Sequence, residues 1–542
     1  MSPLRLGSCC LLACRLLLCK HGYSERFRSG RENKVPQLFE ESVLQDRTIQ
    51  VQTSLVLVRS RSESLMAKGL PLISVNLDSS ASMFATSQHA HFIGIGGIGM
   101  SGIAEILLNL GMKVSGSDLR LGPVTERLAQ LGAAIYEGHN PTNVAGATVV
   151  VTSSAVNAGN PEVQEAHARK IPVIQRAEML AELMRLKYGI AIAGMHGKTT
   201  TTSMVASVLS AGGLDPTVVV GGRVDAMGSN ARLGTTQYLV AEADESDRSF
   251  LKLSPILAVV TNLDREHMDC YSDMQDVERA FLDFMDRVPF YGAITACIDN
   301  PRLKCILPRA RRRVFTYGES QDADYRLCFL PPSEVSGGEL RFARFVVNTA
   351  EGPLGPFELH VPGRHNVLNA TAAVAIARQL QVPAEKIAEG LNHYHGVDRR
   401  FQRKGVVRGI TVVDDYGHHP TEIRATLAAA RECGHCRIHV LFQPHRYTRT
   451  KDLMEEFGGA FKDANTVTIL PIYAASEEPI PGVTAETLAA RITGPQVHYV
   501  PDFPAAIAAV AAQAGDGDLV MTLGAGSVSQ LGPQILAALE RA

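Results

Sequence analysis

A lysine and a threonine follow a glycine turn that comes directly after a short apolar strand. The strand is expected over residues 190–193, the turn reads Gly194-Met195-His196-Gly197, and Lys198 and Thr199 follow just before a helical run expected over 200–209. Glycines let backbone N–H groups approach anionic oxygens, and a helix N-terminus adds partial positive charge. We therefore predict a nucleotide phosphate site, in which Lys198 reaches the distal phosphates and the Thr199 hydroxyl ligates Mg²⁺.

The turn is shorter than the standard phosphate loop. That loop has a glycine five positions before Gly197, where this chain has Ile192. A bare Gly-Lys-Thr at a helix start is often a chance match, so the strand before the turn and the helix after it carry the prediction.

Acidic side chains follow the next expected strand, residues 238–242. Glu242, Asp244, Glu245 and Asp247 place four carboxylates within six residues. The carboxyl end of a strand beside the phosphate turn is where an α/β nucleotide site needs its Mg²⁺ ligand. A solvated acidic loop is the alternative interpretation of these residues.

One histidine follows a third expected strand, residues 256–261. The segment after it reads TNLDREHMD and contains His267. Carboxyl ends of parallel strands meet at one edge of a sheet, so His267 can reach the same crevice. A lone histidine is more often structural, and only this shared topology makes it a candidate.

Two asparagines open another expected helix, residues 366–379. Asn366 and Asn369 share one helix face at spacing i, i+3. They either hydrogen-bond an adenine edge or cap the helix. Arg399 and Arg400 come later, at an expected domain boundary, where arginines suit charge stabilisation in a closing cleft.

Arginines and histidines gather after two further strands, residues 410–414 and 437–442. The segment DDYGHHP follows the first strand, and QPHRYTR follows the second. Both segments lie at the ligand edge of such a sheet, and their cationic side chains indicate an anionic substrate group. A salt-bridged surface is the alternative.

A second glycine turn lies near the start of the regular pattern. Gly94, Gly96 and Gly99 fit the spacing G-x-G-x-x-G after an expected strand, and Asp118 follows about twenty residues later. With the strand, the helix and the acid in register, this turn predicts a dinucleotide or nucleotide-diphosphate site.

Strands and helices alternate from His89 onward, which is typical of parallel sheets covered by helices. We predict three α/β domains, over residues 86–187, 188–396 and 397–542. Expected antiparallel strands at 324–329, 340–347 and 356–361 form a small insertion in the central domain.

The composition is that of an ordinary globular protein. The 542 residues are 45% apolar and 20% charged with a net charge of -2, which does not suggest nucleic acid as a partner. Residues 1–85 are expected to be a disordered leader or sequence upstream of a start assigned too early. The apolar run at 11–19 is too short to span a membrane, so no membrane partner is expected.

The motifs together resemble the Mur ligases of peptidoglycan precursor synthesis. The segments GIGGIGMS, HGKTTT, VAEADESD, HMD, GRHNVLNA, GVDRRF, DDYGHHP and FQPHRYTR occur in this order, and the resemblance extends over about residues 89–540. It implies ATP-dependent, ADP-forming ligation of L-alanine to the carboxylate of UDP-N-acetylmuramate through an acyl phosphate. It also implies Mg²⁺, a cytoplasmic location, and a monomer or weak homodimer. The same resemblance implies that the first and the C-terminal domains are Rossmann-like and that the central one is a P-loop-type ATPase domain.

The resemblance assigns roles to individual positions. The implied catalytic residues are Lys198, His267 and Arg399, and the implied metal ligands are Thr199, Glu242 and His267. The implied ATP-binding residues are Gly194, Met195, His196, Gly197, Lys198, Thr199, Thr200, His365, Asn366 and Asn369. The implied UDP-substrate residues are Gly94, Gly96, Gly97, Ser101 and Asp118, and those for the amino acid are Tyr416, His418, Arg446 and Arg449.

One position departs from the family pattern. Met195 stands where the family usually has threonine. The side-chain hydroxyl is lost, but the backbone donors of the turn remain, so we expect activity to persist.

Three other functions are weighed against this one. A sister ligase attaches a recycled tripeptide to the same sugar, although its first glycine turn is not expected to read GGIGMS. A NAD-dependent oxidoreductase would explain Gly94 and Gly96 but leaves the Lys198 turn unexplained. A non-catalytic nucleotide switch is the third alternative.

Overall fold

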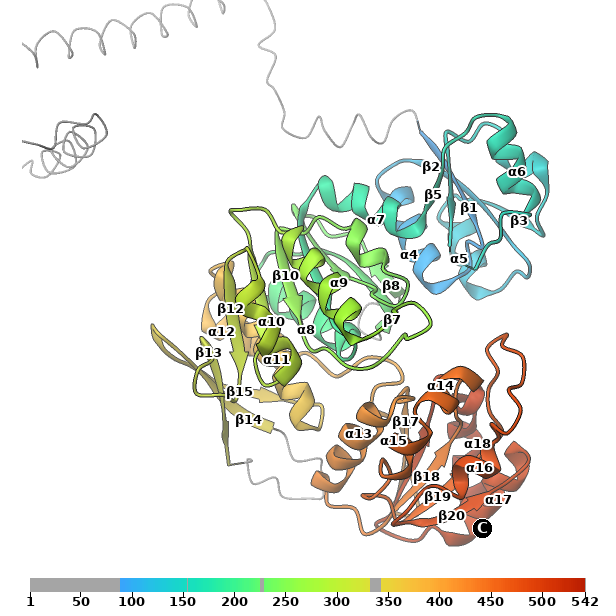
Figure 1. Ribbon diagram of the computed structural model, residues 1–542, viewed down its shortest axis with the longest axis vertical. Helices are drawn as coiled ribbons and strands as arrows, with labels where there is room; N and C mark the ends of the chain where they lie inside the picture. The colour runs from blue at the N-terminus through green and yellow to red at the C-terminus, as the bar shows by residue number, and fades with distance from the viewer. Residues whose placement is uncertain (1–87, 154, 225–228, 332–342, 542) are drawn as a thin grey trace, which may run out of the picture. The chain divides into compact units, whose positions relative to one another are not determined.

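The structure is a computed structural model that describes residues 88–153, 155–224, 229–331 and 343–541. These residues all belong to one compact unit, Asp78–Ala542. The expected leader, residues 1–85, lies outside them. Three β-sheets, each built from one continuous stretch of chain, define an N-terminal, a middle and a C-terminal part (Figure 1).

The N-terminal part is a five-stranded parallel sheet in the order β3-β2-β1-β4-β5. Its strands are β1 His89–Ile93, β2 Lys113–Asp118, β3 Ala134–Glu137, β4 Val149–Thr152 and β5 Val173–Gln175. Its helices are α4 Ile98–Asn109, α5 Pro123–Gln130, α6 Pro161–Ala168 and α7 Arg176–Arg185, with a 3₁₀ turn at Pro141–Val144. This is the doubly wound arrangement predicted from the sequence.

The middle part is a ten-stranded sheet in the order β15-β14-β13-β12-β11-β10-β6-β9-β7-β8. Its strands are β6 Tyr188–Ala193, β7 Thr217–Val224, β8 Ser229–Arg232, β9 Tyr238–Glu242, β10 Leu257–Val260, β11 Ala293–Cys297, β12 Val314–Gly318, β13 Tyr325–Leu330, β14 Ala343–Thr349 and β15 Gly352–Leu359. Its helices are α8 Lys198–Ala211, α9 Met274–Asp286, α10 Pro301–Ile306, α11 Arg364–Gln379 and α12 Ala384–Asn392, with 3₁₀ turns at Ser249–Lys252 and Leu307–Arg309.

The predicted antiparallel insertion is confirmed as one edge of this middle sheet. Strands β13, β14 and β15 pair antiparallel with one another, and β13 joins them in parallel to β12. The last strand begins at Gly352, four residues before the start expected from the sequence. Gly352 and Gly355 both have positive φ angles there, and such glycines read as a turn in the sequence.

The C-terminal part is a six-stranded sheet in the order β16-β17-β21-β18-β19-β20, parallel except for β16. Its strands are β16 Gln402–Val407, β17 Ile410–Asp415, β18 Ile438–Phe442, β19 Thr466–Ile469, β20 Gln496–Tyr499 and β21 Leu519–Leu523. Its helices are α13 Pro420–Glu432, α14 Tyr447–Asp452, α15 Met454–Gly458, α16 Ala485–Ala489, α17 Phe503–Gln513 and α18 Leu531–Arg541, with a 3₁₀ turn at Ser527–Gln530.

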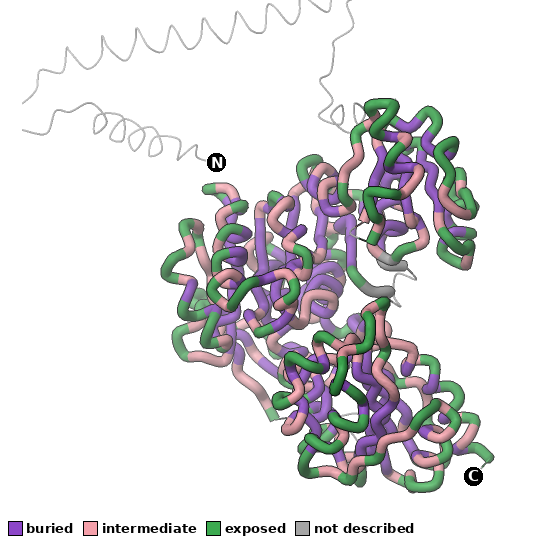
Figure 2. Tube along the Cα trace, turned by 45° about the vertical axis from the view of Figure 1, so that its right-hand side comes forward, coloured by how far each residue is buried: buried purple, intermediate pink, exposed green. Residues whose placement is uncertain are grey.

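The central strands are buried on both faces, as Figure 2 shows by their purple tubes. Every residue of β10 and β18 is buried, which is why parallel strands read as continuous apolar runs rather than alternating ones. Helices cover both faces of the C-terminal sheet, where two separate apolar clusters form. Such rigid sheets fix the loops at their carboxyl ends, where the candidate site lies.

None of the helices in the described ranges is long and apolar enough to cross a membrane.

Candidate functional site

The Gly194–Gly197 turn joins the buried strand β6 to helix α8. Gly194 and Gly197 have φ angles of +133° and +83°, which side chains other than glycine rarely adopt. A Cβ on Gly194 would lie 2.0 Å from Thr261 Oγ1. Met195 between them is buried, with 4% of its surface exposed. The two glycines therefore allow the turn to pass close to β10 and to aim α8 at a ligand.

Lys198 occupies the first position of α8 and folds back over the turn. Its Nζ donates hydrogen bonds to Gly194 O at 2.8 Å, to Met195 O at 3.2 Å and to Glu245 Oε1 at 2.7 Å. Burial disfavours the charged amine, but the nearby carboxylates of Glu245 and Asp244 outweigh it and raise the pKa of Lys198. The cation is thus secured at the phosphate turn.

Two buried carboxylates beside Lys198 have unused oxygens. Glu242 Oε1 and Glu245 Oε2 are buried without a hydrogen-bond partner. Burial raises the pKa of Glu242, although the Thr199 hydroxyl hydrogen-bonds this carboxylate. His267 Nε2 lies 3.5 Å from Glu245 Oε1. Unpaired carboxylate oxygens are what a hard cation such as Mg²⁺ takes as ligands, so the predicted metal residues fit that ion, and Glu245 joins them.

A cavity of about 210 Å³ opens beside the turn, and we call it the amide-lined cavity. Four asparagines line it: Asn262, Asn300, Asn366 and Asn369. The other predicted ATP residues that line it are His196, Gly197, Thr200 and His365. Its opposite wall comes from β17 and α13 of the C-terminal part, so two parts of the chain enclose it.

The two predicted asparagines, Asn366 and Asn369, make different contacts with the protein's own backbone. Asn366 Nδ2 donates to Pro362 O at 2.7 Å, as a helix-start contact does. Asn369 packs against the phosphate turn, because a Cβ on Gly197 would lie 2.8 Å from Asn369 Oδ1. Burial, followed by the charge of Arg400, lowers the pKa of His365 to about 4. The asparagines and the neutral His365 therefore offer uncharged hydrogen-bonding groups that suit a planar ring, although charged side chains such as Arg400 and Glu422 also line the cavity.

A second cavity of about 450 Å³ is strongly charged, and we call it the charged cavity. It brings together Met195, Lys198, Glu245 and His267 from the middle part with Tyr416, His418, Arg446 and Arg449 from the C-terminal part. The structure thus gathers Lys198, one of the predicted metal residues (His267) and the predicted amino-acid residues around one space, whereas Thr199 and Glu242 are not in its lining. An anionic group here would face Lys198 on one side and arginines on the other.

Three residues of this region have left-handed backbone conformations without being glycine. The φ angles are +56° at His267, +61° at Arg399 and +69° at Arg446. Such conformations are strained and concentrate at functional sites, where the surrounding structure holds them.

The two neighbouring arginines of the GVDRRF segment have different surroundings. Arg399, the predicted catalytic one, donates to Asp414 Oδ2 and to the carbonyls of Gly524 and Gly526. It lines neither cavity, whereas Arg400 lines both and lies 3.6 Å from Glu422. Both guanidinium groups nevertheless lie over the Tyr416 ring, at 4.9 Å for Arg399 and 5.1 Å for Arg400. Of the two, Arg400 is the one that lines the cavities, which the sequence does not reveal, and the catalytic role of Arg399 stays a prediction.

The UDP-loop candidates lie in the N-terminal part and line neither cavity. Gly96 N donates to Asp118 Oδ2 at 2.9 Å, so the acid braces the glycine turn. Gly94 has a φ angle of +77°, Gly97 precedes α4, and Ser101 is buried within that helix. The predicted glycine turn, helix and acid are in register.

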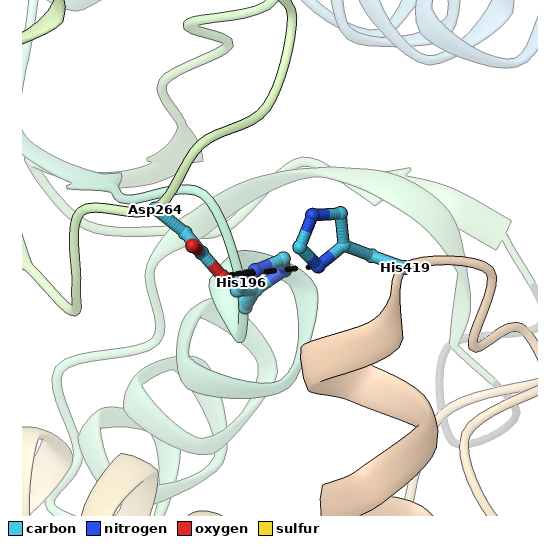
Figure 3. A group of neighbouring side chains, drawn as sticks. All are labelled: His196, Asp264 and His419. Carbon is cyan, nitrogen blue, oxygen red and sulfur yellow. Dashed lines mark hydrogen bonds and ion pairs between the residues drawn. The ribbon is translucent and has the colours of Figure 1, made fainter. Parts of the chain in front are cut away.

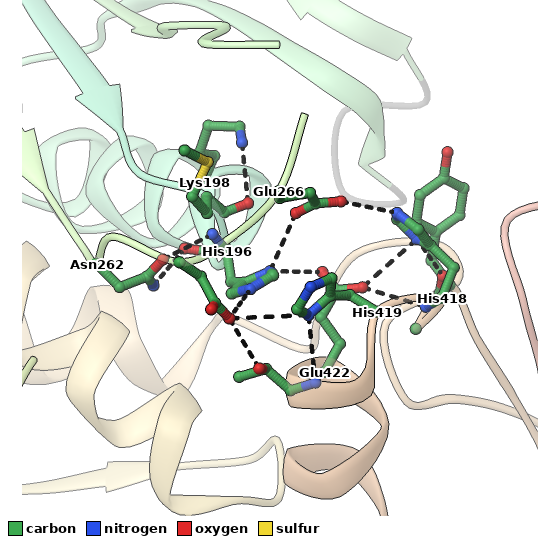
Figure 4. A network of polar contacts seen from close by, with 12 residues as sticks. His196, Lys198, Asn262, Glu266, His418, His419 and Glu422 are labelled. Atoms are coloured by element: carbon green, nitrogen blue, oxygen red, sulfur yellow. Dashed lines mark hydrogen bonds and ion pairs between the residues drawn. The ribbon is translucent and has the colours of Figure 1, made fainter. Parts of the chain in front are cut away.

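His196 is the centre of a buried polar network between the middle and C-terminal parts (Figure 4). Its Nε2 lies 2.9 Å from Asp264 Oδ2, and its Nδ1 lies 3.4 Å from Glu422 Oε1. Burial opposes the charged ring, but hydrogen bonds to Asp264 and Glu422 raise the pKa of His196 to about 10. The ring is therefore an imidazolium cation at neutral pH.

His196, Asp264 and His419 also have the residue types and spacing of a metal site (Figure 3). Two ring nitrogens of this group already have hydrogen-bond partners. His419 Nδ1 accepts from Thr421 N at the start of α13, and His196 carries a proton toward Asp264. A proton on His196 supplies the positive charge here, so a metal ion would have to displace it.

Sequence reasoning missed Asp264, Glu266 and Glu422 as site residues, and it named Arg400 only beside Arg399 at the expected domain boundary. Asp264 and Glu266 stand in the segment that contains His267, so that motif offered a signal. Glu422 lies in a helix after DDYGHHP and belongs to no motif, and its importance comes only from what the fold places opposite it.

Three family models match consecutive stretches of the chain. They are the "Mur ligase family, catalytic domain" over 89–188, the "Mur ligase middle domain" over 192–377 and the "Mur ligase, glutamate ligase domain" over 399–526. A UDP-N-acetylmuramate–L-alanine ligase of Acidobacterium capsulatum is 67% identical over 84% of this chain and 99% of its own length. The chain belongs to the Mur ligase family.

Two further proteins of this family support the fold. A relative from Koribacter versatilis with the same name is 65% identical over 84% of this chain and 98% of its own length. The crystal structure of UDP-N-acetylmuramate-alanine ligase from Thermotoga maritima is 27% identical, with a TM-score of 0.68 over 84% of this chain and 99% of that one. These likenesses confirm the predicted three-domain α/β fold.

The high pKa of His196 can be measured directly. The folded value of about 10 exceeds the usual ~6.5, so its stabilising effect is complete below pH 6.5 and is lost as the pH rises toward 10. In ¹³C-histidine NMR, we expect His196 to stay protonated at pH 8, and Asp264→Asn to lower its pKa by about 1 unit or more. His445 is a neutral reference, because burial and the nearby His418 lower its pKa to about 3. A His196 that titrates near 6.5 would contradict this ion pairing.

The two arginines give a matched pair of variants. Arg400→Ala is expected to weaken binding of an ATP analogue by roughly tenfold or more, since a charge-assisted contact is worth ~1.5–3 kcal/mol, with little change in thermal stability. Arg399→Ala is expected to lower the melting temperature by about 4 °C, because it releases the carbonyls of Gly524 and Gly526. Calorimetric titration measures binding of the ATP analogue to both variants, and thermal melting measures their stability. Weaker binding by Arg399→Ala and a lower melting temperature of Arg400→Ala would instead assign the binding role to Arg399.

Proposed function

We propose that the protein is the ligase that joins L-alanine to the carboxylate of UDP-N-acetylmuramate, with ATP converted to ADP and phosphate. The observation that carries the proposal is the match to relatives of this name at 67% and 65% identity over 99% and 98% of their lengths. The gathering of anion-binding and amide-lined cavities around one glycine turn supports it.

The chemistry follows from the inertness of a carboxylate toward amines. Phosphorylation gives the carboxylate a leaving group, and the amine of L-alanine then attacks the acyl phosphate through a tetrahedral intermediate. Proteins promote such steps by positioning reactants and neutralising developing charge. Lys198 is held at the turn and lines the charged cavity, where it would offset charge on the transferred phosphoryl group.

We assign the adenine ring to the amide-lined cavity and the reacting groups to the charged cavity. His365 is neutral there and the asparagines offer both donors and acceptors. In the charged cavity, His418 and Arg449 lie against Glu266, with Tyr416 and Arg446 also in its lining. We assign these four residues to the carboxylates of the amino acid and of the sugar, which are both anionic.

We further propose that Mg²⁺ binds through Thr199, Glu242, Glu245 and His267. The buried, unpartnered oxygens of Glu242 and Glu245 are the reason for this choice. When bound, Mg²⁺ would neutralise phosphate charge and orient the phosphates.

The glycine turn of the N-terminal part would take the UDP group of the substrate. Gly96, Gly97 and Ser101 surround the start of α4, whose N-terminus favours diphosphate, and Asp118 fixes the turn. Because the step uses ATP and a soluble nucleotide sugar, we place it in the cytoplasm. We propose the domain limits 86–187, 188–396 and 397–542 and a monomeric or weakly dimeric enzyme.

The decisive assay is ADP release. We expect release to require both UDP-N-acetylmuramate and L-alanine, because the acyl phosphate needs its carboxylate and its amine acceptor. Lys198→Ala should lower the rate by roughly 10²–10³, while Lys252→Ala, which removes an amine paired with Glu178, should keep it.

Each alternative predicts its own result in that assay. Activity with the tripeptide but not with L-alanine would identify the recycling ligase. Reduction of NAD without any need for ATP would identify an oxidoreductase, and an unchanged function of Lys198→Ala would favour a nucleotide switch.

Met195 gives a separate check. Its side chain is buried while its carbonyl accepts from Lys198, so Met195→Thr should change the rate of ADP release by less than about threefold, the turn's backbone being kept. If the wild-type protein has no ATPase activity and Met195→Thr restores it, the missing threonine hydroxyl is essential.

A further inference from the structure

Two buried glutamates cross the junction between the middle and C-terminal parts in opposite directions. Glu266 belongs to the middle part, and its carboxylate accepts from Arg449 Nη2 at 3.2 Å and lies 3.4 Å from His418 Nε2. Glu422 belongs to the C-terminal part, and its Oε1 lies 3.4 Å from His196 Nδ1 on the phosphate turn. Each part thus gives a carboxylate to a histidine of the other part (Figure 4).

Further hydrogen bonds continue the same junction. Thr421 Oγ1 donates to Asp264 Oδ2 at 2.7 Å, and His419 Nε2 lies 3.3 Å from Arg265 O. These contacts flank the reciprocal pairs, so a whole row of middle-part residues is bonded to the start of α13. The row forms only when the two parts are together.

Both glutamates are paired with basic groups from both parts. Glu266 contacts His418 and Arg449 of the C-terminal part and lies 3.7 Å from His196 Nδ1 of its own part. Burial disfavours the charged form of Glu422, but the charge of His418 and the hydrogen bond with His196 hold its pKa well below the usual value. The contacts of both carboxylates are therefore made by the protein's own side chains.

We propose that Glu266 and Glu422 are positioning residues that form a reciprocal latch holding the two parts closed around the charged cavity. Glu266 orients His418 and Arg449, which we assign to the amino acid, while Glu422 orients His196 and, at 3.6 Å, Arg400. The contacts that hold the two parts together therefore also align the residues that bind the reactants. This inference rests on the proposed ligase function.

The test uses Glu266→Gln and Glu422→Gln in the full chain, which keep side-chain shape and remove the charge. We expect kcat for ADP release to fall about tenfold or more, with KM for UDP-N-acetylmuramate within twofold of the wild type, because that substrate's UDP group binds in the N-terminal part. Glu432→Gln, at the exposed far end of the same helix α13, is the matched control and should keep the wild-type rate.

Small-angle X-ray scattering supplies a readout that a purely local role would not move. An ATP analogue should decrease the radius of gyration of the wild type and of Glu432→Gln, and this decrease should be reduced by half or more in both latch variants. Because this arm needs only the ATP analogue, it still tests the latch if L-alanine proves to be the wrong amino acid. That latter failure would appear as wild-type protein without alanine-dependent ADP release.

Two results would overturn the latch. One is a kcat within twofold of the wild type in both variants. The other is an increase in KM for L-alanine alone with compaction unchanged, which would mean that the carboxylates contact the amine of the substrate. Thermal melting confirms folding, and if one variant does not fold, the other carries the same test from the opposite part of the chain.

Discussion

A buried ammonium group must have negative charge beside it, and the site is arranged around this requirement at Lys198. Desolvation would otherwise drive off its proton, so Glu245 is placed 2.7 Å from Nζ, and the carbonyls of Gly194 and Met195 take further hydrogen bonds. Those carbonyls can reach the amine only because the turn adopts a backbone that glycine permits. The position of the cation therefore depends on both the shape of the turn and the burial of the acids.

The surroundings of Lys198 divide into two kinds of space by the same electrostatic logic. In the amide-lined cavity, burial and Arg400 keep His365 neutral, so this histidine and the asparagines offer uncharged groups to the ligand. In the charged cavity, cations of the C-terminal part face Lys198 across an open space. Arg400 and Glu422 line both cavities and connect the two environments.

Much of this arrangement could be predicted from local sequence. The glycine turn, the acids after β9 and the asparagines of α11 each depend on a few adjacent residues, and parallel sheets bring all strand ends to one edge. The order of strands and helices could also be predicted, because apolar residues follow one another in buried parallel strands but recur with the helical period in the covering helices. The short strands β3 and β5 and helix α7 were not predicted, since three or four residues, or a helix without a distinctive start, carry too weak a periodic signal.

By itself the sequence determined which residue types stand at the strand ends, and with them the α/β fold and the phosphate chemistry, because those features are encoded over short stretches of chain. Only the tertiary structure distinguished Arg400, which lines both cavities, from Arg399, which lines neither. It alone placed Glu422 against His196, residues more than two hundred positions apart. Ion pairs across a junction depend on distance in space, and a residue without a motif gains its role only from what the fold brings to face it.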